Sequence, residues 1–143
     1  MKARFVAIGL ALIAMPHRAT AQTPSDSALL QGKFRLVAGT TFGVPVAAAN
    51  LKTSYRTTTG DQLTVMFGGQ LLIKATVRMN PRARPKQMDY TAAAPFAPTK
   101  FAGLYEIRGD TVRLCFGRPD GPRPTALADG PDQTFYVWVR VQP

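Results

Sequence analysis

The chain has 143 residues, of which 45% are hydrophobic, and its 18 basic and 8 acidic side chains give a formal charge of +10. This length fits one domain with a modest core, and the single cysteine, Cys115, excludes an intramolecular disulfide. The single histidine, His17, lies so near the N-terminus that we expect none in the mature protein. This excludes Ser-His and Cys-His nucleophile pairs and the common zinc sites.

The first 21 residues have the layout of a cleavable secretory signal. Lys2 and Arg4 precede an apolar run at 5–15, and small residues at 19–21 (ATA) mark a peptidase site. The run is too short for a membrane-spanning helix, which needs about 20 residues. We predict a helical signal peptide over 1–21, export to the periplasm or extracellular space, and no transmembrane segment after cleavage. The alternative is a retained anchor.

After a flexible polar tether at 22–28, short segments alternate apolar with polar residues. In the clearest segment, 70–79, every second residue from Leu71 to Met79 is apolar, while Lys74 and Arg78 occupy the opposite face. One apolar and one polar face is typical of an antiparallel sheet with one buried side. This pattern predicts eight strands, at 33–37, 51–58, 62–67, 70–79, 86–91, 101–108, 111–116 and 135–141.

Short turns that contain glycine separate several of these strands. Gly68-Gly69 and Gly109-Asp110 predict tight two-residue hairpins. The proline-rich segment 117–133 predicts a long loop rather than a helix. Short helical turns are expected at 25–30, with Ser25 or Asp26 as cap, and at 46–51.

Sequential hairpins favour an up-and-down barrel, because neighbours along the chain then pair in space. Closure also removes exposed strand edges. A sandwich is the alternative, and an outer-membrane barrel is disfavoured because its strands need about 9–11 residues with a lipid-facing apolar band. We therefore predict an all-β fold at 29–143, a small eight-stranded antiparallel barrel that is lipocalin-like and has one or two short helical turns.

Four motifs follow one another through the mature chain: LLQGKFRLV at 29–37, PKQMDYT at 85–91, GLYEIRGDTVRLCF at 103–116 and GPRPT at 121–125. Together they resemble a small conserved domain found in many copies in planctomycete-type bacteria. The resemblance covers residue 29 to about residue 141. It implies a lipocalin-like fold and export, and it brings no assigned activity.

That domain usually has tryptophan where this chain has Phe34. In lipocalin-like barrels a Gly-x-Trp in the first strand closes one end, and its ring packs under an arginine of the last strand. The resemblance therefore implies that Gly32 and Phe34 form this closure and that Arg140 is the cation over the ring. Such a contact is worth about 0.5–2 kcal/mol.

Most other polar residues have structural interpretations. Asp110 in the Gly109-Asp110 turn is expected to accept local backbone hydrogen bonds. Glu106, the one glutamate, is expected to form an ion pair. Cys115 is expected to be a buried thiol, although Arg113 on the same face could lower its pKa and make it reactive. We expect no catalytic site, no metal site and no cofactor.

Five residues are candidates for ligand binding. Arg123, held between Pro122 and Pro124, either grips an anion at the barrel mouth or pins its loop by binding Glu106 or a loop carbonyl. The other four are aromatic side chains that either line a cavity or serve in ordinary packing, namely Tyr55, Tyr90, Tyr105 and Trp138.

Two functions remain open at this stage. The first is a non-catalytic binding module for a small, partly apolar ligand. The second is a structural or interaction protein of the cell envelope that binds anionic polymer, since removing Lys2, Arg4 and Arg18 leaves 15 basic and 8 acidic residues, a charge of +7. The basic residues are scattered except for a cluster at 82–86. We expect a monomer without specific nucleic-acid binding, and an enzyme is least favoured.

Overall fold

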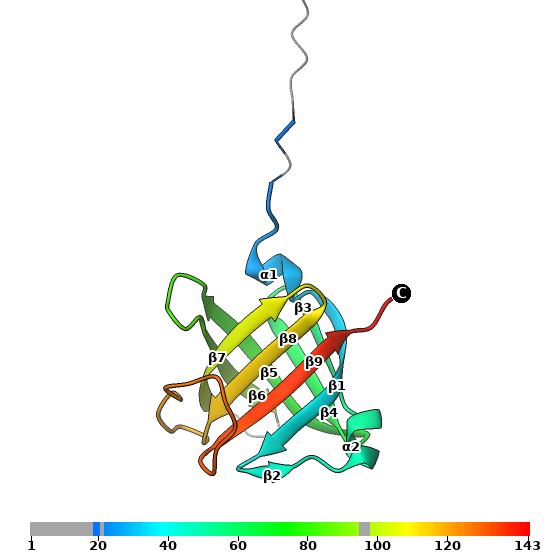
Figure 1. Cartoon of the computed structure of the whole chain (residues 1–143), viewed down its shortest axis with the longest axis vertical. Helices are drawn as coiled ribbons and strands as arrows, with labels where there is room; N and C mark the ends of the chain where they lie inside the picture. Colours follow the sequence, from blue (N-terminus) through cyan, green and yellow to red (C-terminus); the bar gives the residue numbers. More distant parts are fainter. Residues whose placement is uncertain (1–18, 21, 95–97) are drawn as a thin grey trace, which may run out of the picture.

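Each strand pairs with the next one along the chain and the first pairs with the last, so the sheet closes into an eight-stranded antiparallel barrel (Figure 1). The computed structural model describes residues 19–20, 22–94 and 98–143, and the predicted signal peptide lies almost wholly outside them. The predicted all-β barrel is therefore confirmed. Its strands are β1 (Gly32–Thr41), β3 (Tyr55–Thr59), β4 (Gln62–Phe67), β5 (Gln70–Asn80), β6 (Gln87–Ala94), β7 (Thr99–Arg108), β8 (Thr111–Gly117) and β9 (Gln133–Arg140).

Three short elements complete the barrel. The two-residue strand β2 (Val44–Pro45) pairs with the end of β1. Helix α1 (Asp26–Leu29) is capped by Ser25, whose Oγ accepts the Ala28 N–H at 3.1 Å, as predicted. Helix α2 (Ala48–Lys52) confirms the second predicted turn. α1 lies over one end of the barrel, whereas α2 and β2 lie at the other (Figure 1).

Strand boundaries differ from the predicted ones where the alternation is interrupted. The sequence pattern stops β1 at residue 37, but the strand continues to Thr41 because a bulge between Leu36 and Ala38 shifts its phase. The predicted strand at 51–58 begins too early, because Leu51 and Lys52 belong to α2. Both hairpin turns, Gly68-Gly69 and Gly109-Asp110, are confirmed.

The long loop between β8 and β9 covers part of the outer surface. Alternate side chains of the strands point inward and form the core, among them Phe34, Leu114 and Trp138. Leu104 and Cys115 are also fully buried but do not belong to this inner cluster. The Cys115 Sγ lies 3.4 Å from the carbonyl oxygen of Ala128, so the loop shields this outward-facing pair.

The α1 end of the barrel is closed by Arg140. Its guanidinium lies 4.6 Å from the centre of the Phe34 ring, as the resemblance implied. The same guanidinium donates to the carbonyl oxygen of Gln31 at 2.7 Å and to that of Leu29. Gly32 has a φ of +97°, and a Cβ there would lie 3.2 Å from Arg140 Nη1, so glycine suits both the backbone and the space. Arg140 thus ties β9, β1 and the end of α1 together.

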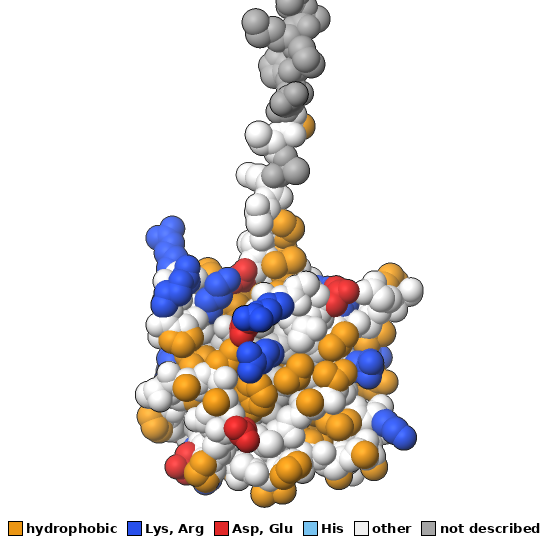
Figure 2. All heavy atoms as spheres, viewed as in Figure 1, with side chains coloured by type: hydrophobic (Ala, Val, Ile, Leu, Met, Phe, Trp, Pro, Cys, Tyr) orange, Lys and Arg blue, Asp and Glu red, His pale blue; other side chains and the backbone are white. Residues whose placement is uncertain are grey.

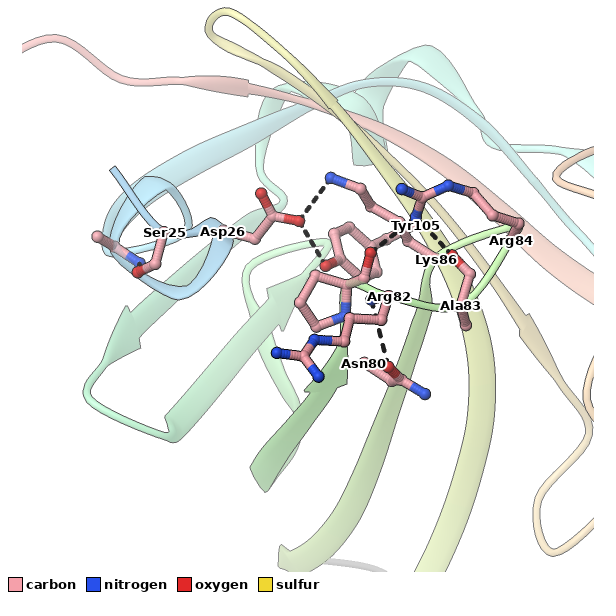
Figure 3. Close-up of polar contacts among 10 residues, drawn as sticks. Ser25, Asp26, Asn80, Arg82, Ala83, Arg84, Lys86 and Tyr105 are labelled. Carbon is pink, nitrogen blue, oxygen red and sulfur yellow. Dashed lines mark hydrogen bonds and ion pairs between the residues drawn. The ribbon is translucent and has the colours of Figure 1, made fainter. Parts of the chain in front are cut away.

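A second contact holds α1 on the barrel. The carboxylate of Asp26 accepts hydrogen bonds from Lys86 Nζ at 2.8 Å and Tyr105 Oη at 2.6 Å (Figure 3). Burial acts to raise the pKa of Asp26, but the bonds from Lys86 and Tyr105 and the charges of Lys86 and Arg84 outweigh it and lower the pKa. Burial and the bond to Asp26 raise the pKa of Tyr105. The carboxylate therefore stays ionised and holds the helix in place.

Replacing Arg140 with lysine should lower the free energy of unfolding by about 1–3 kcal/mol, because lysine cannot donate to both carbonyls while covering the ring. Urea unfolding followed by Trp138 fluorescence measures this change. Arg35→Lys is the matched control, since Arg35 is exposed on β1 and the described residues offer it no hydrogen bond or ion pair. The control should shift stability by less than about 0.5 kcal/mol. Equal stability of Arg140→Lys and the parent would contradict the closure.

Asp26 should stabilise the fold in a pH-dependent way. Its folded pKa lies below the usual value of 3.8, so the stabilisation is complete above that pH and is lost as pH falls through the folded pKa. Asp26→Asn should therefore cost about 1 kcal/mol at neutral pH and almost nothing in strong acid. Asp129→Asn is the control, because Asp129 is an exposed loop residue whose carboxylate forms no hydrogen bond or ion pair with the described residues. A pH-independent difference would contradict the ion pair.

Candidate functional site

A cavity of about 440 Å³ occupies the barrel at the end opposite α1. Its inner wall is apolar and includes Val65, Ile73, Leu114 and Phe116. This volume falls within the range of about 300–1,000 Å³ that is typical of small-molecule sites. Small barrels can be filled completely by their own side chains, and this one is not. Partly exposed side chains surround the mouth, among them Phe42, Leu72, Phe101 and Pro119.

Two of the four predicted aromatic residues line this cavity. Tyr90 and Trp138 both face it, and the Tyr90 ring packs against Phe116 with ring centres 4.2 Å apart. Tyr55 lies outside it, next to buried Arg56 on β3, with the ammonium of Lys33 4.2 Å above its ring. Tyr105 points inward, but at the α1 end, where it binds Asp26. The aromatic residues are therefore divided among the cavity, the outer face and the closed end.

Arg123 does not line the cavity. Its guanidinium makes two hydrogen bonds to the Asp89 carboxylate, at 2.7 and 3.1 Å, and a third to the carbonyl oxygen of Gly103 at 2.7 Å. This arrangement pins the proline-rich loop to β6 and β7. The proposed pairing with Glu106 is wrong, because Glu106 is bound by Arg113 directly opposite it on β8, at 3.1 Å, and by Arg108.

The remaining structural candidates behave mostly as expected. Cys115 is a buried free thiol, and burial raises its pKa more than the contact with Ala128 lowers it, so the described environment does not activate it. Arg113 is occupied by Glu106 and by the Phe135 ring. The Asp110 carboxylate accepts from Gln142 Nε2 at 3.2 Å and lies 3.7 Å from Arg140 Nε, instead of binding local backbone, because Arg140 at the end of β9 and Gln142 just after it both reach its turn.

Sequence reasoning missed the most unusual residue in the cavity, Arg56. Its side chain points inward from β3 and is only 1% exposed. None of its three guanidinium nitrogens makes a hydrogen bond of normal geometry to a described protein atom. The segment around it, 55–59 (YRTTT), is polar on both faces, so alternation could not show which face is inside. A buried charge without a partner costs several kcal/mol.

Other polar residues line the two cavities that Arg56 borders. Burial raises the pKa of the Tyr90 phenol, while the charge of Arg56 and the hydrogen-bond interaction of the phenol with its guanidinium act in the opposite direction. Trp138 Nε1 and Thr58 Oγ1 are also buried and have no hydrogen-bond partner in the described chain. A mostly apolar cavity with a few polar groups at its inner end is the usual form of a ligand-binding site.

No three His, Cys, Asp or Glu side chains group together as a possible metal site within 19–20, 22–94 and 98–143. In the same residues no helix is long and apolar enough to span a membrane. Comparison with known protein families, curated proteins and solved structures finds no match. The resemblance to the planctomycete-type domain therefore stays a prediction, and function must be argued from the cavity itself.

Proposed function

We propose that this is an exported, non-catalytic binding protein that holds a small, partly apolar molecule inside its barrel. The observation that carries the proposal is the 440 Å³ cavity, apolar along its wall and polar at Arg56 and Tyr90. Burying apolar surface contributes about 25 cal/mol per Å², so a ligand that fills this space gains most of its affinity from its apolar part. The polar groups would then orient it.

The positions of the two barrel ends support this function. Arg140, Asp26 and the buried Leu30 close the α1 end. The opposite end is bordered by partly exposed apolar side chains such as Phe42 and Leu72. A ligand that enters through this apolar end keeps its apolar part in contact with apolar side chains throughout entry.

A neutral fluorescent probe, N-phenyl-1-naphthylamine, tests the proposal. It should bind with a rise in fluorescence, and Thr134→Trp should weaken binding at least about tenfold, because the new ring would occupy the cavity mouth. Thr57→Trp places the same ring on the exposed face of β3 and should leave binding unchanged. Circular dichroism checks that both variants fold. Failure of the parent protein to bind, or equal binding by both variants, would contradict a ligand in the cavity.

A second candidate function uses the basic surface. The loop between β5 and β6 carries Arg82 and Arg84 at the α1 end, and neither pairs with a carboxylate in the described residues. Most basic side chains on the face in Figure 2 lie in the half nearer α1. Such a patch favours anionic partners, and we propose attachment to an anionic envelope polysaccharide as the alternative to ligand carriage.

Retention on immobilised alginate tests this alternative. Binding should weaken steeply from low to physiological salt, where the Debye length falls to about 8 Å. The double variant Arg82→Gln/Arg84→Gln should elute at lower salt than the parent. Lys74→Gln/Arg78→Gln removes the same charge from the exposed face of β5 and serves as the control. Equal elution of the two double variants would show that net charge alone, rather than this loop, sets retention.

A further inference from the structure

We propose that the ligand of the cavity is a single-chain amphiphile whose oxyanion head group binds Arg56. This inference rests on the proposed function, because it names the class of molecule that the cavity accepts. Three features of the structure support it: an unpaired buried guanidinium, the absence of a counter-ion within reach, and the position of Arg56 at the inner end of the apolar wall.

The guanidinium of Arg56 has the chemistry of an anion receptor. Nε, Nη1 and Nη2 are all buried, and none makes a hydrogen bond of normal geometry to a described protein atom. The Tyr90 phenol lies beside the guanidinium and interacts with it, but a neutral phenol does not balance its charge. More than about 90% of buried polar groups in proteins are hydrogen-bonded, so an arginine with three unused nitrogens indicates a missing partner. Its planar array of donors matches the two oxygens of a carboxylate, or those of a sulfate or phosphate group.

The protein supplies no counter-ion of its own among the described residues. Asp61 is the only acidic residue lining either cavity, and its carboxylate accepts from Gln62 Nε2 at 2.8 Å and forms no ion pair with Arg56. The acids on neighbouring elements are committed elsewhere, Asp89 to Arg123 and Asp26 to Lys86 and Tyr105. The positive charge of Arg56 is therefore available to a ligand.

The position of Arg56 orients that ligand. Arg56 is the one residue that lines both the large apolar cavity and a smaller, more polar cavity of about 250 Å³ on the α1 side. Trp138 lines the large cavity and Thr58 the smaller one, and their buried Nε1 and Oγ1 atoms have no hydrogen-bond partner among the described residues. The indole N–H can only donate, so together with Arg56 it favours an acceptor-rich head group. The apolar chain would then run along Leu114 and Phe116 towards the mouth.

The charge of the head group is tested with four ten-carbon probes that differ only in that group. Decanoate, decyl sulfate, 1-decanol and decyltrimethylammonium each compete with N-phenyl-1-naphthylamine for the full mature protein. The two anions should bind at least about tenfold more tightly than decanol, and the cation should bind most weakly. Comparison of decanoate with decyl sulfate shows whether a carboxylate or a tetrahedral oxyanion is preferred, and either result supports an oxyanion head.

Arg56→Met separates recognition of the anion from occupation of the cavity. The variant should lose the preference for the anions and keep the affinity for decanol. Its thermal midpoint without ligand should rise by several degrees, because a buried unpaired charge is replaced by an apolar chain of similar length. Arg35→Met, on the exposed face of β1, should keep the preference and the midpoint. The four-probe comparison on the parent protein does not depend on the variant folding.

The outcomes distinguish this inference from the function on which it rests. Equal binding of decanoate and decanol by the parent, or an unchanged anion preference in Arg56→Met, would overturn the role of Arg56 and leave the apolar cavity intact. Such a result is expected if water or chloride solvates the guanidinium. A lower midpoint for Arg56→Met would show that Arg56 already has a partner within the protein. Failure of decanol and the neutral probe to bind would overturn the proposed function itself.

Discussion

The contact between Arg140 and Phe34 is the constraint on which the rest of this barrel depends. It joins the last strand to the first and reaches the carbonyl groups at the end of α1, so one side chain serves both circular closure and the sealing of one end. Asp26 completes the seal through Lys86 and Tyr105. The large apolar cavity lies at the opposite end, away from these contacts.

The hollow half contains the one side chain that packing does not explain. An arginine that is 1% exposed, and that makes no hydrogen bond of normal geometry and no ion pair with the described residues, lowers stability, because its desolvation is not repaid. A residue of this kind is better explained by a ligand that supplies the missing acceptors than by the fold.

On the outer surface, the residues that stood out in the sequence, such as Arg123, have structural roles. Arg123 between two prolines suggested an anion-binding group, yet both of its terminal nitrogens are bound to Asp89. The loop that it anchors covers Cys115, and burial raises the pKa of the thiol although the contact with Ala128 acts to lower it. The prolines around Arg123 therefore marked a residue that attaches a loop, whereas nothing in the sequence around Arg56 marked it as the unusual residue of the cavity.

Alternation and turn chemistry in the sequence by themselves predicted the eight barrel strands to within a few residues, both hairpin turns and the Ser25-capped turn, while the resemblance to the planctomycete-type domain implied the contact of Phe34 with Arg140. Tertiary structure decided what alternation cannot show. It chose Asp89 rather than Glu106 for Arg123, since register places Arg113 opposite Glu106. It also turned the side chain of Arg56 inward. Every residue of 55–59 is polar or amphipathic, so the sequence does not distinguish an inner from an outer face there, and only closure of the sheet does. The alternation of residues within a strand shows which side chains share a face. Which of the two faces is buried depends on pairing with strands that are distant in the chain.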